Sequence, residues 1–146
     1  MLRLALVALV ATTLIGCLPI RQGNDLGYDF AVFVDRAEAP DQSCAVDIGL
    51  HNNLDNDYAN FEYALNFLDS QGRWAAGPLV QGDYVPSGGV AKRDYIFPVA
   101  CERLASAQVA KELCLDIVGW AGRQDCYSIG KIVINETVPL PAQPAQ

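Results

Sequence analysis

Histidine is the scarcest of the catalytic residue types in this chain, since His51 is the only one among 146 residues. A zinc site needs several Cys, His or carboxylate ligands, and a Ser–His–Asp hydrolase would have to use this one residue. No serine lies in the Gly-x-Ser-x-Gly pattern that presents the nucleophile of many hydrolases. We therefore expect His51 to be a structural surface histidine where a strand meets a loop, and the protein not to be an enzyme. An enzyme that relies on His51 is an alternative.

Basic residues are also few and scattered, with ten Lys and Arg against 17 Asp and Glu. Binding to nucleic acid phosphates needs clustered Lys and Arg, so nucleic acid is excluded as a partner. The acidic balance is typical of a soluble domain. No Gly-rich segment follows a strand and opens a helix, so no nucleotide cofactor is expected, and no metal.

Long apolar runs are missing, because a transmembrane helix needs about 20 apolar residues. The longest run begins after Arg3, covers residues 4–15, and is interrupted only by Thr12 and Thr13. A basic start followed by a short apolar run and small residues is typical of a secretory signal peptide. The run ends in Leu14-Ile15-Gly16-Cys17.

These four residues resemble the lipobox of bacterial lipoproteins, in which the signal peptide is removed before a lipidated cysteine. The resemblance implies that residues 1–16 are removed, and that diacylglycerol and a further acyl chain such as palmitate attach at Cys17. Two or three acyl chains anchor a protein stably to a membrane. Leu18 stands where an aspartate resembles the inner-membrane retention signal of enterobacteria. We therefore expect the outer membrane and its periplasmic face, with the inner membrane and the cell surface as alternatives.

Four cysteines remain once Cys17 carries lipid. An even number in an exported chain indicates disulfides, and no Cys-x-x-Cys pair suggests a metal site. The sequence predicts two disulfides but leaves all three pairings open. The four residues are Cys44, Cys101, Cys114 and Cys126.

Apolar residues alternate with polar ones through most of the remaining chain, which indicates β-strands. The clearest case is residues 44–50, where every even position is apolar. Residues 101–110 would also allow one short helix. The pattern favours an all-β fold, an antiparallel immunoglobulin-like β-sandwich of about seven strands. Strands are expected at residues 30–35, 44–50, 61–67, 79–85, 90–99, 113–120 and 126–134. The expected core consists of Phe30, Val32, Val46, Ile48, Leu50, Tyr63, Leu65, Phe67, Phe97, Leu115, Ile117, Ile132 and Ile134.

Residues 65–74, Leu-Asn-Phe-Leu-Asp-Ser-Gln-Gly-Arg-Trp, and the later Val-Pro-Ser-Gly-Gly at 85–89 resemble the FxLYD-type, immunoglobulin-like domains of bacterial lipoproteins. Those domains have a D-x-x-G turn between two strands and a later P-G turn. The resemblance covers about 25 residues and implies a fold, with no catalytic residues to transfer. The four cysteines are not part of the family's pattern.

Four segments follow from these patterns: a signal peptide at 1–16, lipidated Cys17 with a flexible tether at 17–27, a β-sandwich domain at 28–136, and a Pro-rich tail at 137–146. Within the domain, Trp74 and Trp120 lie near predicted loops and could form a binding surface. The Asp55–Asp57 loop is the best candidate for calcium, although it lacks the glycine and the distal glutamate of a calcium loop. A solvated polar turn is the expected interpretation.

Together these features favour a membrane-anchored periplasmic lipoprotein that acts as a structural or adaptor component of a cell-envelope assembly. It would bind the membrane through its lipid and one or more envelope proteins through its sandwich. The first alternative is an envelope module that binds a small molecule, a glycan or calcium through Trp74, Trp120 and the Asp55–Asp57 loop. The second is an envelope enzyme that uses His51.

Overall fold

The computed structural model describes residues 27–119 and 123–138. The signal peptide, Cys17, the tether up to residue 26, Trp120 and the tail from residue 139 lie outside the described residues. No helix in the described ranges is long and apolar enough to cross a membrane. The strands are β1 (Phe30–Ala39), β2 (Ser43–Asn52), β3 (Tyr58–Leu68), β4 (Trp74–Ala76), β5 (Leu79–Val85), β6 (Val90–Phe97), β7 (Ser106–Ile117), β8 (Gln124–Tyr127) and β9 (Ile129–Val138).

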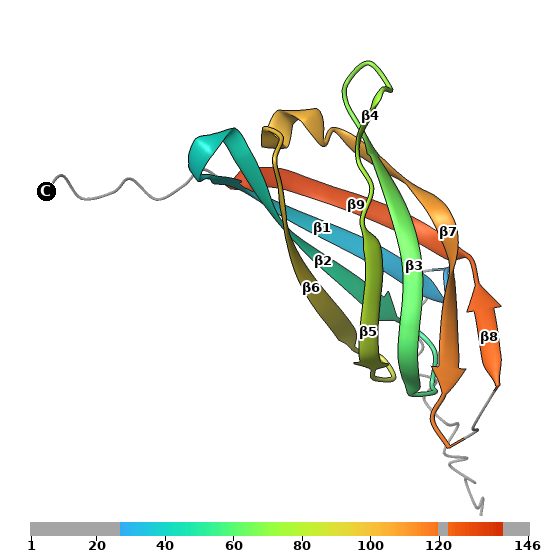
Figure 1. The fold of residues 1–146 in the computed structure, drawn as a ribbon. Coiled ribbons are helices and arrows are strands. Elements are labelled where there is room, and N and C mark those ends of the chain that lie inside the picture. The colour runs from blue at the N-terminus through green and yellow to red at the C-terminus, as the bar shows by residue number, and fades with distance from the viewer. Residues whose placement is uncertain (1–26, 120–122, 139–146) are drawn as a thin grey trace, which may run out of the picture.

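The strands form two sheets that pack face to face, so the predicted β-sandwich is confirmed (Figure 1). One sheet has the order β6-β2-β1-β9. In the other, β3 lies between β7 and the consecutive strands β4 and β5, and β8 pairs with β7. Neighbouring strands are antiparallel except β1 and β9, which run parallel.

The core lies between the sheets and is built by the alternation that the sequence displays. In β2, Cys44, Val46, Ile48 and Leu50 point inward and are buried, because side chains alternate between the two faces of a strand. Every residue of the expected core either belongs to the cluster of buried apolar residues between the sheets or packs against it. Four of those residues are only partly buried, namely Phe97, Ile117, Ile132 and Ile134.

The chain differs from expectation where local sequence is a poor guide. The short helix allowed at residues 101–110 is only a 3-10 turn, η2 (Cys101–Arg103), and β7 begins at Ser106. Backbone pairing of β7 with β3 outweighs the helix preference of its alanines. Residues 126–134 are split at Ser128, because β8 joins one sheet and β9 the other. β9 also includes Thr137 and Val138, which the sequence assigned to the tail.

The two ends of the sandwich are built differently. At the entry end, where the described chain begins, the Asn53 amide donates to the carbonyl of Asp29 at 2.8 Å. At the far end, a second 3-10 turn, η1 (Pro40–Gln42), joins β1 to β2, near η2 and the turn at residues 69–73 (Figure 1). β1 has ten residues and so separates the two ends by roughly 30 Å.

The predicted turn after β3 is present and is organised by Asp69. Its carboxylate accepts backbone hydrogen bonds from Gln71 and Arg73 at 2.9 and 3.0 Å, and pairs with the Arg73 guanidinium. Gly72 has φ of 75°, a conformation that glycine adopts without strain. The backbone and side-chain hydrogen bonds from Arg73 hold the pKa of Asp69 below its ordinary value. The turn's contribution to stability is therefore present above the usual carboxyl pKa and is lost on acidification.

Both predicted disulfides are present, and the structure resolves their pairing. Cys44 in β2 bonds to Cys101 in η2, which joins the two parts of the chain across the far end. Cys114 in β7 bonds to Cys126, the residue directly opposite in β8. The first disulfide is completely buried, whereas the second lies on the outer face of its sheet.

Removal of the two disulfides should cost different amounts of stability. The residues of the Cys44–Cys101 pair are 57 positions apart, and those of the Cys114–Cys126 pair are 12 apart. Constraint of the unfolded chain predicts losses of about 4 and about 3 kcal/mol respectively. Urea unfolding of the two double Cys→Ala variants measures this order. A larger loss for the Cys114–Cys126 pair would contradict the prediction.

Candidate functional site

His51 lies at the end of β2, where the sequence placed it. It is half-buried on the outer face, opposite Ala31 and with its ring centre 6.3 Å from that of Phe33. Within residues 27–119 and 123–138, no side chain hydrogen-bonds to its imidazole.

The loop at residues 53–57 is tied to the turn between β5 and β6. The Asp57 carboxylate accepts a hydrogen bond from the Ser87 amide at 2.8 Å. A hydrogen bond to Asp57 also raises the pKa of Tyr84 above its ordinary value. Buried Asn52 donates to the carbonyls of Asn56 and Pro86. Asp55 is exposed nearby, and the described part of the chain has no group of three His, Cys, Asp or Glu residues placed to hold a metal.

Trp74 lies far from this loop. It begins β4 at the far end and is 63% exposed, while Asp55 and Asp57 lie at the entry end. The 11 residues of β3 separate them, a span of roughly 35 Å. Trp120 lies outside the described residues. The structure therefore does not bring Trp74 together with Asp55 and Asp57 into one binding surface.

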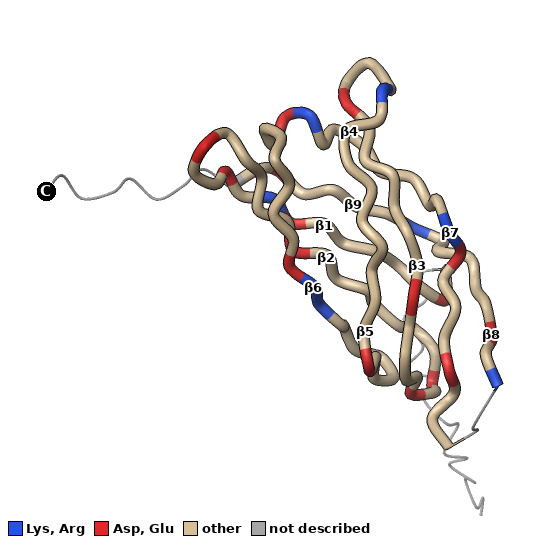
Figure 2. The backbone as a smooth tube through the Cα atoms, viewed as in Figure 1, with Lys and Arg blue, Asp and Glu red and all other residues tan. Residues whose placement is uncertain are grey.

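A different surface stands out on the outer face of the β6-β2-β1 layer. Asp35 of β1 is directly opposite Asp47 of β2, which is directly opposite Asp94 of β6. In Figure 2, red stretches that mark acidic residues lie near one another on β1, β2 and β6. We call these three residues the aspartate row. Like charges placed directly opposite each other destabilise a sheet.

One lysine offsets part of this charge. Lys92 of β6 points to the same outer face, and its Nζ lies 3.0 Å from Oδ2 of Asp47. The hydrogen bond and charge of Asp47, with the charges of Asp35 and Asp94, raise the pKa of Lys92 above its ordinary value. Asn135 of β9 donates a hydrogen bond to Asp35. Asp94 makes no hydrogen bond or ion pair with any described residue.

A row of three apolar residues, which we call the apolar row, lies beside the aspartate row. Ala37, Ala45 and Ile96 are direct neighbours across the same three strands. The short alanine side chains leave an open hollow of about 500 Å³, which all three aspartates and Ile96 line. Ile96 is 73% exposed, the largest value among the large apolar side chains of the described residues. We call the hollow with its two rows the outer trough.

The sequence analysis missed the outer trough because its residues are distant in the chain. The sequence does show that each aspartate occupies the polar side of a predicted strand, and this was the only signal pointing to the trough. Which positions become neighbours depends on strand order and register, and alternation alone specifies neither.

Comparisons with known proteins bear on the fold. No protein family and no curated protein matches the sequence. Among solved structures, the chain is similar to IrmA from Escherichia coli, with a TM-score of 0.53 and 13% sequence identity. The match covers 82% of this chain and 97% of IrmA. At this identity the likeness shows a shared fold alone.

Replacement of Lys92 by methionine should destabilise the sandwich, because the aspartate row would lose its cation. A lysine whose pKa is raised by folding stabilises the protein below its ordinary pKa, so the loss should be present at neutral pH. We expect the melting temperature to fall by roughly 2–5 °C, and Asp47→Asn in the same chain to restore part of it. Differential scanning calorimetry measures both.

Lys131→Met is the matched control, since Lys131 of β9 lies over the ring of Tyr28 and away from the aspartate row. Equal destabilisation by Lys92→Met and Lys131→Met would show that the aspartate row does not depend on Lys92.

Proposed function

We propose that this chain is a lipid-anchored lipoprotein on the periplasmic face of the outer membrane, acting as a structural or adaptor component of a cell-envelope assembly. Cys17 carries the lipid, and a short tether connects it to the sandwich. The lipobox-like Leu14-Ile15-Gly16-Cys17 supports the anchor. Two disulfides support an oxidising compartment, where such bonds persist.

The observation that carries the adaptor function is that the chain enters the domain at one end, which leaves the opposite end distant from the anchor. The chain enters at the end where Asn53 holds Tyr28 and Asp29, through hydrogen bonds of 3.0 and 2.8 Å to their carbonyls. A tether attached there keeps the entry end near the membrane. The far end, roughly 30 Å away along β1, then faces away from the lipid and is presented to other proteins.

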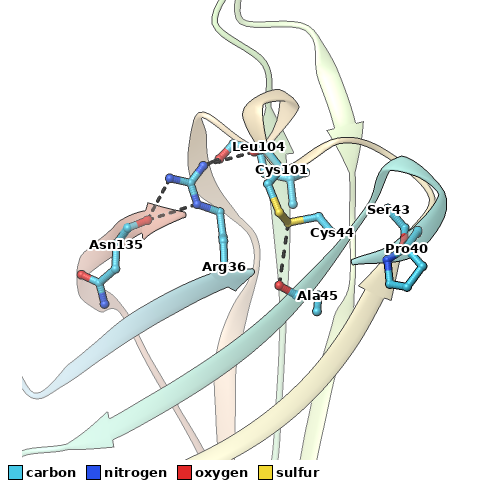
Figure 3. Close-up of a disulfide and its surroundings, with 8 residues drawn as sticks. All are labelled: Arg36, Pro40, Ser43, Cys44, Ala45, Cys101, Leu104 and Asn135. Carbon is cyan, nitrogen blue, oxygen red and sulfur yellow. Dashed lines mark hydrogen bonds between the residues drawn. A yellow bond between two sulfur atoms is a disulfide. The ribbon is translucent and has the colours of Figure 1, made fainter. Parts of the chain in front are cut away.

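The far end is rigid, which suits a surface that positions a partner. The Arg36 guanidinium donates to the carbonyls of Cys101 and Leu104 at 3.2 and 2.7 Å, and twice to the carbonyl of Asn135 (Figure 3). One side chain of β1 thus holds both the η2 segment and β9. The neighbouring Cys44–Cys101 disulfide holds η2 to β2. A preorganised surface loses little conformational entropy when it binds.

The anchor is tested by the variant Cys17→Ser, with Gln22→Ser in the tether as the control. In the parent chain and the control, mass spectrometry should find an N-terminal peptide that begins at Cys17 and carries acyl chains. Both proteins should sediment with membranes. Cys17→Ser should lose the acyl mass, because serine has no thiol to take the lipid. An unmodified Cys17 in the parent chain would contradict the proposal.

A further inference from the structure

Repulsion within the aspartate row destabilises the sheet, and the core does not require charged residues at these positions. Its three carboxylates lie on the outer face, away from the core, within about 10 Å of one another across adjacent strands. Lys92 neutralises only one of them. Asp94 makes no hydrogen bond and no direct ion pair with any described residue, and Oδ1 of Asp47 is buried without a hydrogen-bond donor. A second cation placed over the row would relieve the repulsion and could pair with the exposed carboxylate of Asp94.

The apolar row supplies an apolar contact next to the three carboxylates. Ala37 and Ala45 leave the hollow open, and Ile96 projects beside it. The two rows are two residues apart along each strand, a spacing of about 6.7 Å. An extended chain lying along the strands repeats its side chains at the same spacing. It would place a cationic side chain over the aspartates and the next side chain on that face against Ile96.

We infer that the outer trough binds a basic, extended segment of a partner protein, in which Lys or Arg alternates with apolar residues on one face. This inference rests on the proposed adaptor function and names its surface and its partner class. The trough adjoins the far end, since Ala37 and Ala45 each lie three residues from η1. Charge complementarity selects the occupant. A second copy would bring another aspartate row against the first, and residues 139–146 of this chain contain no Lys or Arg.

The partner would lie on the face of the sheet, because two backbone acceptors at the adjoining edge are already used. Arg93 of β6 donates to the carbonyl of Gln81 at 2.7 Å, and Tyr95 donates to that of Leu79 at 3.1 Å. These side chains occupy backbone acceptors of edge strand β5, which a partner strand would otherwise use. Binding to this flank therefore relies on side chains, and it should weaken as ionic strength rises.

The test uses the full chain, purified in detergent, and a fluorescein-labelled peptide that repeats Arg-Thr-Leu-Thr. In the extended peptide, Arg and Leu alternate on one face and Thr lies on the other. A second peptide has Glu in place of Arg. Fluorescence anisotropy at low salt should detect binding of the Arg peptide and none of the Glu peptide. Asp94→Asn and Ile96→Ser should each weaken binding by roughly three- to fivefold. Both positions are exposed, so neither change should disturb folding, which circular dichroism checks.

The matched control is Asp83→Asn, which removes the same charge from an exposed position of β5 in the other sheet. It should leave the affinity for the Arg peptide unchanged. Equal weakening by Asp94→Asn and Asp83→Asn, binding of the Glu peptide, or a dimer that Asp94→Asn abolishes would overturn the inference. A lipidated, membrane-bound chain that does not bind the Arg peptide would overturn this inference alone. A chain without lipid that binds the peptide at the trough would overturn only the anchor.

Discussion

The closure of the far end by Arg36 and the Cys44–Cys101 disulfide is the constraint on which the rest of the sandwich depends. The chain passes here between the sheets, from β6 through η2 to β7. Backbone carbonyls in such a crossover need hydrogen-bond partners when they are buried away from water. The guanidinium supplies donors to Cys101, Leu104 and Asn135, in charge-assisted bonds that are stronger than neutral ones. With the crossover held in this way, the sheets keep a common core between them.

A closed core leaves the outer faces free to vary. The inward side of β1 and β2 is almost wholly apolar, and any polar group there would lose its hydration. The outward side tolerates three carboxylates in one row because water and Lys92 screen them. The outer trough, which we propose as a binding surface, therefore leaves the interior unchanged. We propose that the anchor holds the domain and that this face receives the partner.

Local patterns were sufficient to predict the sandwich, most strands and the presence of two disulfides. Residues 44–50 were identified as a strand because their alternation is strict, and Asp69 with Gly72 marked a turn through local hydrogen bonding. The segment at 101–110 misled because alanine favours a helix locally, while its pairing with β3 is a contact between distant parts of the chain. The break at Ser128 depends on which sheet each half joins, and alternation does not encode that choice.

The candidate site depended still more on tertiary structure. Asp35, Asp47 and Asp94 become neighbours only through the register of β1, β2 and β6. The residues that the sequence singled out, Trp74 with Asp55 and Asp57, lie at opposite ends of β3. Pairing of the cysteines was equally hidden, because it requires the position of η2 against β2.

The orientation of the domain on the membrane is the central claim, and depth-dependent fluorescence quenching tests it most directly. A fluorophore would be attached to an introduced cysteine at Ser87, in the β5–β6 turn of the entry end, or at Gln42, in η1 of the far end. The lipidated chain would be placed in vesicles whose headgroups carry a quencher. The account predicts strong quenching of the probe at Ser87 and little at Gln42. Equal quenching at both positions, or stronger quenching at Gln42, would contradict it.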